Sequence, residues 1–202
     1  GVRDCALLLD VMAGADPRDP VSQEAPVRRV IDGVNAMPRG ARLWVLPAQE
    51  REGVEAAVLA AYDEALATLQ GLGMQLVEKP LPQSCADSMR IAGQLMSAEG
   101  YDHLGALFER SDLTFDANIR RRILLGRDVA AGEYLRLLRA RDQARSAMLA
   151  AMDGIEACVF PTNAISAIPV ADVDELATPL SRFGRFVNLM NLCSLAVPAG
   201  LS

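Results

Sequence analysis

The sequence predicts an α/β fold, because short apolar runs of strand length alternate along it with longer helical patterns. Residues 42–46 and 74–78 are two such runs, and apolar residues at helical spacing over residues 54–72 separate them. Two strands joined in this way by a helix and tight turns form a βαβ unit. The strands of such a unit are parallel, and its crossover is right-handed.

The chain begins with a predicted helix that has one apolar stripe. The stripe consists of Val2, Cys5, Leu9 and Met12, and Gly14 is placed to end the helix. We expect this stripe to pack on the core. Residues 15–40 contain four prolines and no sustained periodicity, which predicts a long surface connection. This connection is the expected internal boundary of the chain, although not a linker between separate domains.

Helices are predicted to dominate the middle of the chain, at residues 84–110, 116–126 and 131–153. Two later segments, residues 156–160 and residues 195–197, are predicted as buried strands. Each is a short apolar run followed by a proline, which cannot donate a hydrogen bond to a continuing sheet. The predicted elements suit one domain or a large part of one.

Composition limits the classes of function that the chain can have. The 202 residues are 51% hydrophobic, so the chain can bury a substantial core. A net charge of -6 argues against a nucleic-acid surface, which needs a concentrated basic face. The chain has no apolar run of about eighteen residues or more, so no membrane segment is predicted. Small-molecule or protein partners fit this composition better.

The four cysteines are scattered among apolar neighbours, which predicts small buried thiols rather than disulfides or metal ligands. A reducing, cytoplasmic location follows as an expectation. His103 is the sole histidine, which excludes a multi-histidine metal centre, and we expect it at the surface. No nucleotide-binding or zinc-protease motif occurs, so no cofactor is predicted. Lys79 is the sole lysine and is expected to be a solvated charge at a strand end.

Both ends of the chain resemble segments of the amidase signature family. Residues 183–200 are similar to the family's C-terminal core segment, a helix that leads into a central strand, and residues 2–20 to the helix and loop that follow its catalytic core. Residues 121–126 and 157–162 extend the resemblance. The resemblance implies a mixed β-sheet covered by helices on both faces, incomplete in this fragment. Residues 1–202 would then be part of a single amidase signature domain, truncated at both ends.

In that family, amides are cleaved by a serine nucleophile that a lysine activates through a second serine, within a glycine- and serine-rich loop. This sequence contains no such loop, so the resemblance implies catalytic residues upstream of the chain and none within it. It thus implies a fragment of an amidase that hydrolyses the C–N bond of a carboxylic amide through an acyl-serine intermediate. The fragment alone is expected to be inactive, supplying scaffold and part of the pocket wall. Residues 183–200 look closest to amidases that act on small urea-derived amides such as allophanate.

Two residues are predicted to contact substrate. Arg122, in an Arg-Ile-x-x-Gly pattern, resembles the position that holds a glutamine carboxylate in amidotransferase relatives, and a guanidinium offers paired donors for that role. At least two of the three arginines at residues 120–122 are expected to be solvated helix charges instead. Thr162 follows a buried strand, at the edge where ligands bind in α/β sheets, although a simple strand end explains it as well.

Two alternatives to the amidase stay open. One is a glutaminase that resembles an amidotransferase subunit, which is disfavoured because Ser181 and Arg182 occupy the neighbourhood where those relatives carry an acidic residue for the glutamine amino group. The other is a non-catalytic scaffold or binding domain with the same fold. The expected partners are a small-molecule amide and, in a homodimer, a second copy of the chain.

Overall fold

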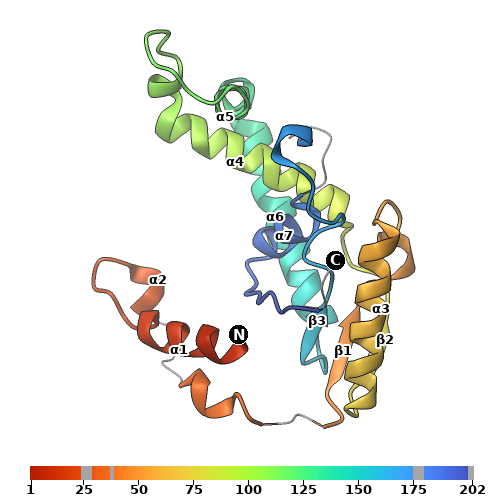
Figure 1. Ribbon diagram of the computed structural model, residues 1–202. Helices are drawn as coiled ribbons and strands as arrows, with labels where there is room; N and C mark the ends of the chain where they lie inside the picture. Colours follow the sequence, from red (N-terminus) through yellow and green to blue (C-terminus); the bar gives the residue numbers. More distant parts are fainter. Residues whose placement is uncertain (24–28, 37–38, 175–179, 200–202) are drawn as a thin grey trace. The chain divides into compact units, whose positions relative to one another are not determined.

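The computed structural model describes residues 1–23, 29–36, 39–174 and 180–199, except for the side chain of Val21. Two compact units divide this chain (Figure 1). The first contains Gly1–Arg39 together with Ala196–Pro198, and the second contains Gly40–Leu195 and the residue after Pro198. The division after Arg39 falls at the end of the proline-containing connection, where the sequence predicts the internal boundary.

The first unit is built around helix α1 (Val2–Met12), which packs against the short helix η1 (Val30–Gly33). The Asp10 carboxylate links the two helices, because it accepts hydrogen bonds from the backbone N–H groups of Val30 and the next residue at 2.6 and 3.1 Å. Ala6 is buried, whereas the predicted apolar stripe of α1 is exposed. Packing of that stripe on a larger core stays a prediction.

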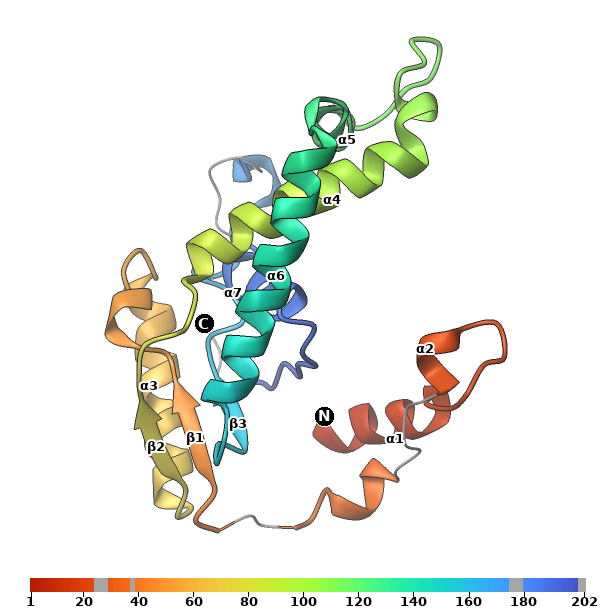
Figure 2. The same cartoon turned by 180° about the vertical axis from the view of Figure 1, so that it is seen from behind.

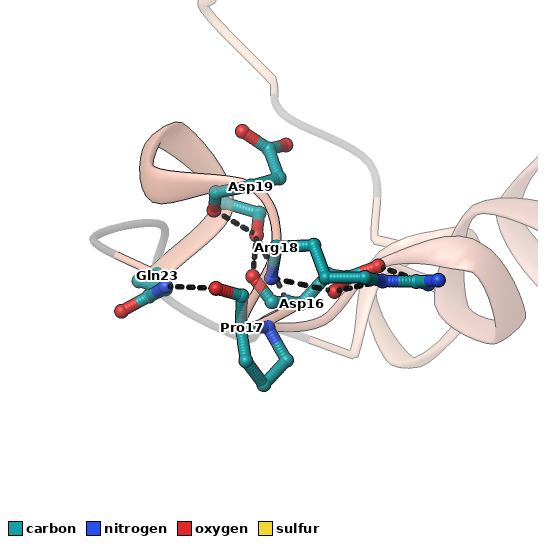
Figure 3. Close-up of polar contacts among 6 residues, drawn as sticks. Asp16, Pro17, Arg18, Asp19 and Gln23 are labelled. Atoms are coloured by element: carbon teal, nitrogen blue, oxygen red, sulfur yellow. Dashed lines mark hydrogen bonds and ion pairs between the residues drawn. The ribbon is translucent and has the colours of Figure 1, made fainter.

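The segment after α1 folds into a compact turn around Asp16 (Figure 3). The Asp16 carboxylate accepts hydrogen bonds from the Arg18 side chain at 3.0 and 2.8 Å and from the Arg18 backbone N–H at 2.9 Å. These hydrogen bonds lower the pKa of the Asp16 carboxyl group below its usual value. Helix α2 (Pro20–Gln23) follows, and the Gln23 amide closes the turn by donating to the Pro17 carbonyl oxygen at 3.2 Å.

A parallel three-stranded sheet lies at the centre of the second unit. Strand β1 (Arg42–Val45) is flanked by β2 (Gln75–Glu78) and β3 (Ala157–Val159). Helix α3 (Ala56–Gly71) joins β1 to β2, which confirms the predicted βαβ unit. The predicted α/β class is confirmed, and the three strands of the described chain are all parallel to one another.

Helices α3 and α6 (Ala131–Ala151) cover opposite faces of this sheet. Figure 1 shows α3 in front of β1 and β2, and Figure 2 shows it behind them, with α6 in front. The topology explains this arrangement, because the chain moves from β1 to β2 in one direction and returns past β1 to β3 in the other. Two right-handed crossovers in opposite directions place their helices on opposite faces.

Helix α4 (Cys85–Phe108) organises the helical layer. It packs against α6 and against three shorter helices, which are α5 (Ala117–Leu124), η3 (Leu125–Asp128) and α7 (Arg182–Leu189). The single-turn helices η2 (Ala48–Glu50) and η4 (Val170–Asp172) complete the unit. The three long helical patterns of the sequence are therefore confirmed. No helix in the described part of the chain is both long enough and apolar enough to span a bilayer.

The core joins the sheet to α6 and α7 through large buried side chains. Trp44, Leu46, Met148, Phe186 and Met190 are all less than 2% exposed. Burial of one such side chain stabilises a fold by about 1.5–3 kcal/mol relative to leaving it exposed. The carboxyl end of β1 is therefore packed in one core cluster with α6 and α7.

The predicted strand at residues 195–197 is wrong. These residues form no strand, and the side chains of Leu195 and Val197 are 53% and 55% exposed. An apolar run becomes a strand only where a neighbouring strand offers hydrogen-bond partners. None of the three described strands pairs with this segment.

The cysteines follow the prediction only in part. Cys85 is buried at the start of α4 and Cys158 is half-buried in β3, whereas Cys5 and Cys193 are exposed. Cys5 lies on the uncovered side of α1, and Cys193 follows the end of α7. Apolar neighbours in the sequence therefore do not ensure burial, because burial depends on the face that an element presents to the core.

Candidate functional site

The topology of the sheet indicates where a ligand would bind. The chain leaves β1 toward β2 on one side, whereas β3 lies on the other side, so the strand order reverses between β1 and β3. In open parallel sheets, ligands bind at such a switch point, outside the carboxyl ends of the strands. Residues 46–52 after β1 and residues 160–166 after β3 lie at this position and are called the switch-point edge below.

A tyrosine hydroxyl connects β1 and β3 at the switch-point edge. The Tyr62 hydroxyl accepts a hydrogen bond from the Leu46 N–H at 2.8 Å and donates one to the Val159 carbonyl oxygen at 2.7 Å. Tyr62 comes from α3 and is 5% exposed. Burial raises the pKa of Tyr62 above its usual value, so the hydroxyl keeps its proton. It therefore acts as donor and acceptor at once.

The loop after β3 also rests on α3 through Glu55, the residue that precedes the helix. The Glu55 backbone N–H donates to the Ala164 carbonyl oxygen at 2.8 Å, and the Glu55 carboxylate accepts from the Ser166 N–H at 2.7 Å. Thr162 lies between Val159 and Ala164, which are both anchored, and it is exposed. The residue predicted to contact substrate is thus on a loop that is held at both ends. Its contact with substrate stays a prediction.

A nearly buried ion pair joins the loop after β1 to α7. The Nη2 atom of Arg182 lies 3.2 Å from Oε2 of Glu50 and 2.9 Å from the Glu50 carbonyl oxygen, while Nη1 donates to the Glu52 carbonyl oxygen at 2.6 Å. The Arg182 and Glu50 side chains are 17% and 10% exposed. Oε1 of Glu50 accepts from the Cys85 N–H at 3.1 Å, at the start of α4. Removing one partner of a buried pair leaves an unpaired charge, which costs about 3–5 kcal/mol.

Lys79 is a structural residue and not the solvated charge that the sequence predicts. Its ammonium group donates to the carbonyl oxygen of Ala151, the last residue of α6, and lies 4.3 Å from the centre of the Trp44 ring. A cation is stabilised at a helix C-terminus and over an aromatic face. The prediction is wrong because the long side chain, half-buried, reaches from the end of β2 to the end of this helix.

The arginines at residues 120–122 lie on α5, away from the switch-point edge. Helix α5 packs on α4 and η3, at the end of α4 that Figures 1 and 2 show farther from the sheet. Arg120 donates to the Arg110 carbonyl oxygen at 2.9 Å, and Arg122 donates to the Asn118 carbonyl oxygen at 3.4 Å. Arg121 and Arg122 are exposed. The structure therefore does not bring Arg122 and Thr162 together.

A shallow hollow of about 440 Å³ lies on the surface beside α5 and η3. Its lining residues are Ala117, Arg120, Arg121, Leu124, Leu125, Arg127 and Asp128. Arg122 is not among them, and most of these side chains are exposed. The buried polar contacts that can position a reacting group lie at the switch-point edge instead, which is why we place the candidate site there.

Gly126, the glycine of the Arg-Ile-x-x-Gly pattern, is required by packing. A Cβ atom at this position would lie 1.9 Å from the Ser97 carbonyl oxygen and 2.7 Å from Cβ of Tyr101, both on α4. The nearest of these atoms belongs to the backbone, so it cannot move without moving α4. The close approach of η3 to α4 therefore explains this glycine without a ligand.

Three residues form the polar contacts at the switch-point edge, namely Tyr62, Glu50 and Arg182, and the sequence predicts these contacts for none of them. Tyr62 lies on the apolar face that predicts α3, four residues after Val58, so periodicity indicates its burial but not the role of its hydroxyl. Glu50 closely follows a predicted strand, and this position gives only a weak indication of a role at the site. His103 is exposed on α4, as the sequence predicts, and no group of His, Cys, Asp or Glu among the described residues is arranged to hold a metal ion.

Comparison with known proteins shows the family of this chain. The model of the family Amidase matches residues 1–202, so the chain belongs to that family. An amidase of Pseudomonas putida is 31% identical over 215 residues, which cover 100% of this chain and 45% of the relative. A glutamyl-tRNA(Gln) amidotransferase subunit of Geobacter metallireducens is 29% identical over 227 residues, covering 100% and 47%. The chain therefore spans about half the length of these curated relatives.

Solved structures share the fold. A structure described as an inhibitor-bound vestigial protein complex, bearing on the evolutionary origins of an s-triazine catabolic enzyme, matches with a TM-score of 0.79 at 24% identity. The match covers 94% of this chain and 42% of that chain. A bacterial aryl acylamidase of the amidase signature family matches with a TM-score of 0.74 at 18% identity, over 93% and 42%. The fold implied by the sequence resemblance is thereby confirmed.

Proposed function

We propose that this chain forms part of an amidase that hydrolyses the C–N bond of a carboxylic amide through an acyl-serine intermediate. The chain supplies the scaffold and, at the switch-point edge, part of the substrate pocket wall. The nucleophilic serine and the lysine that activates it lie outside the 202 residues. The observation that carries this proposal is the family match over residues 1–202, together with the 31% identity to an amidase.

The surroundings of Lys79 support the placement of the catalytic residues outside this chain. A lysine that activates a serine must lie within hydrogen-bond reach of it. Lys79 instead donates to the Ala151 carbonyl oxygen and lies over the Trp44 ring. The sole lysine of the sequence is thus used to join β2 to α6.

A serine-directed phosphonate tests this proposal. We expect the 202-residue chain to hydrolyse no amide and to remain unlabelled, because it lacks the nucleophile. The complete protein that carries the chain should be labelled at one serine and should hydrolyse a small carboxylic amide.

Two outcomes would contradict the proposal in different ways. Stoichiometric labelling of one serine within residues 1–202 would show that the nucleophile lies in this chain. A complete protein that is neither labelled nor active would favour the non-catalytic scaffold instead.

A glutaminase of the amidotransferase type is the second candidate, because the amidotransferase subunit of Geobacter metallireducens is 29% identical over the whole chain. The amidase ranks first because Arg182 lies in the neighbourhood where the resemblance places an acidic residue for the glutamine amino group. Its guanidinium is paired with the Glu50 carboxylate, so that carboxylate is not free to bind the amino group of glutamine. Ammonia release from glutamine, compared with release from a small neutral amide, separates the two candidates in the complete protein.

Arg122 and Thr162 are proposed as two separate substrate contacts. Arg122→Ala in the complete protein should raise KM for a carboxylate-bearing amide about tenfold and leave KM for a neutral amide nearly unchanged. Thr162→Val should raise KM for both substrates, since a hydroxyl can bond the amide group that they share. Arg121→Ala is the control for Arg122, because it removes a neighbouring exposed charge. An equal response of both substrates to Arg122→Ala would place Arg122 on the solvated surface.

The complete protein is also proposed to associate with a protein partner or with a second copy of itself. Two relatives support this, since the name of one describes it as part of an amidotransferase and the other is described as a protein complex. Sedimentation of the complete protein, alone and in extracts of its source, tests the proposal. A single monomeric species under both conditions would contradict it.

A further inference from the structure

The Tyr62 hydroxyl occupies a place in the sheet where a backbone hydrogen bond is expected. The register pairs Val45 of β1 with Val159 of β3. In a parallel ladder with this register, the next bond joins the Leu46 N–H to the Val159 carbonyl oxygen. Each of these two groups is bonded instead to the Tyr62 hydroxyl, at 2.8 and 2.7 Å.

An inserted hydroxyl spreads the two strands. A direct N–H···O bond holds its heavy atoms about 2.9 Å apart. Two bonds that share one oxygen hold the outer atoms farther apart than one direct bond does. β1 and β3 therefore separate after Val45 and Val159, and this separation begins at the switch point of the sheet.

Several contacts keep the hydroxyl in this position. Tyr62 is part of the buried core cluster, and the Arg51 guanidinium lies 5.4 Å from the centre of its ring. Arg51 is in turn paired with Asp63, the residue after Tyr62 on α3. Glu55 at the start of α3 holds the Ala164 carbonyl oxygen, so α3 supports both ends of residues 159–164. Helix α3 therefore both inserts the Tyr62 hydroxyl between the strands and supports the loop of residues 160–164, which begins where β3 separates from β1.

We propose that Tyr62 is a positioning residue, whose hydroxyl keeps β1 and β3 apart at the switch-point edge and thereby sets the position of the loop that contains Thr162. The part of this inference that concerns substrate rests on the proposed function. The part that concerns the strands rests on the hydrogen bonds alone. Tyr62 touches no reacting atom in this scheme and acts through residues 160–164.

Tyr62→Phe tests the spacing directly, because it removes the hydroxyl and keeps the ring that packs in the core. The Leu46 N–H and the Val159 carbonyl oxygen then lose their shared partner, and a buried polar group without a partner is costly. We expect the strands to close and the two groups to bond to each other. Tyr134→Phe is the matched control, since the Tyr134 hydroxyl donates to Glu99 at 3.0 Å on the surface, remote from the sheet edge.

The first measurement is a through-hydrogen-bond NMR coupling between the Leu46 amide nitrogen and the Val159 carbonyl carbon, in complete protein labelled selectively with ¹⁵N-leucine and ¹³C-carbonyl valine. The coupling should be absent in the wild type and in Tyr134→Phe and should appear in Tyr62→Phe. A direct coupling in the wild type would overturn the spacing. So would a Tyr62→Phe protein whose two strands stay apart without that bond.

The second measurement is the kinetics of amide hydrolysis by the complete protein. Tyr62→Phe should raise KM about fivefold or more, with the rate of phosphonate labelling changed less than about twofold, because the loop moves while the nucleophile does not. Adding Thr162→Val to Tyr62→Phe should cost little more, since the contact is already displaced. An unchanged KM beside a new coupling would overturn the positioning role. If the wild-type complete protein hydrolysed no amide, the proposed function would be refuted. The NMR coupling would still test whether the Tyr62 hydroxyl keeps β1 and β3 apart.

Discussion

Glu50 illustrates how one buried carboxylate can order three segments of a chain. One oxygen pairs with Arg182 on α7, and the other accepts from the Cys85 N–H at the start of α4. A carboxylate is favoured near the N-terminus of α4 by the helix dipole, whereas an arginine at the first position of α7 is not. The ion pair offsets the second effect. Because few waters reach the pair, it is screened less than an exposed one.

The two interior cysteines should resist alkylation. Burial, assisted by the Glu50 carboxylate, raises the pKa of the Cys85 thiol to about 12, and burial raises the pKa of the Cys158 thiol to about 11. The thiolate is the nucleophile, so iodoacetamide at about pH 8 should label the exposed Cys5 and Cys193 and spare the other two. Mass spectrometry of the peptides measures this. Equal labelling of all four cysteines in the folded chain would contradict the burial of Cys85.

The same two thiols make stability depend on pH. Both folded pKa values lie above the reference value of 9.0, so the neutral thiol is favoured in the folded state. The resulting stabilisation is complete below the unfolded pKa and is lost as the pH rises through about 11 and 12. The urea concentration at the unfolding midpoint should therefore decrease as the pH rises from about 11 to about 12. The decrease should be smaller in Cys85→Ala, which serves as the control.

At the scale of elements, the junction of η3 and α4 depends on the absence of a side chain. Gly126 brings the backbone of η3 against the Ser97 carbonyl oxygen, and the junction also fixes the end of α5. Asp116 fixes the other end of α5, because its carboxylate accepts from the N–H groups of Asn118 and the next residue, each at 2.9 Å. The orientation of the arginines on α5 follows from these two ends.

Two glycine substitutions test this junction. Gly126→Ala should lower the free energy of unfolding by about 1–3 kcal/mol or more, since the added methyl group meets backbone atoms of α4. Gly132→Ala is the matched control on α6, where a Cβ would meet nothing within 4 Å. It should leave stability unchanged or raise it by up to about 1 kcal/mol. Urea unfolding measures both, and equal effects of the two substitutions would contradict the close approach.

At the scale of the whole chain, the sheet has two open edges in the described residues. β2 and β3 each pair only with β1, so their outer backbone groups are free to bond another strand. Leu195 and Val197 add apolar side chains that are 53% and 55% exposed. Open edges and exposed apolar side chains are both templates for association.

The 202-residue chain expressed alone should therefore be marginally stable and should associate. Sedimentation velocity should show species that grow with concentration, and Leu195→Glu with Val197→Glu should reduce this growth. Thr114→Glu is a control that adds an exposed charge elsewhere. A monodisperse monomer with a sharp, cooperative transition at the usual ~5–15 kcal/mol would show that the chain is stable by itself.

The helices and the first three strands could be predicted from the sequence, because periodicity is a local property of the chain. Residues 84–110 became α4 and residues 131–153 became α6 within a few positions of the prediction. The family resemblance was also local, since it rested on short runs such as residues 157–162. Fold class and family were therefore within reach of the sequence, as was the position of Thr162 after a strand. The predicted burial of that strand is wrong, since Ala157 is exposed and the other two residues of β3 are half-buried.

Only the tertiary structure decided which distant residues meet. It paired Lys79 with the end of α6, Arg182 with Glu50, and the Tyr62 hydroxyl with the ends of β1 and β3. It also showed that residues 195–197, which are among the described residues, form no strand, although their composition is that of a buried strand. Hydrogen bonds and ion pairs join groups that are close in space, and no local pattern of residue types encodes that closeness.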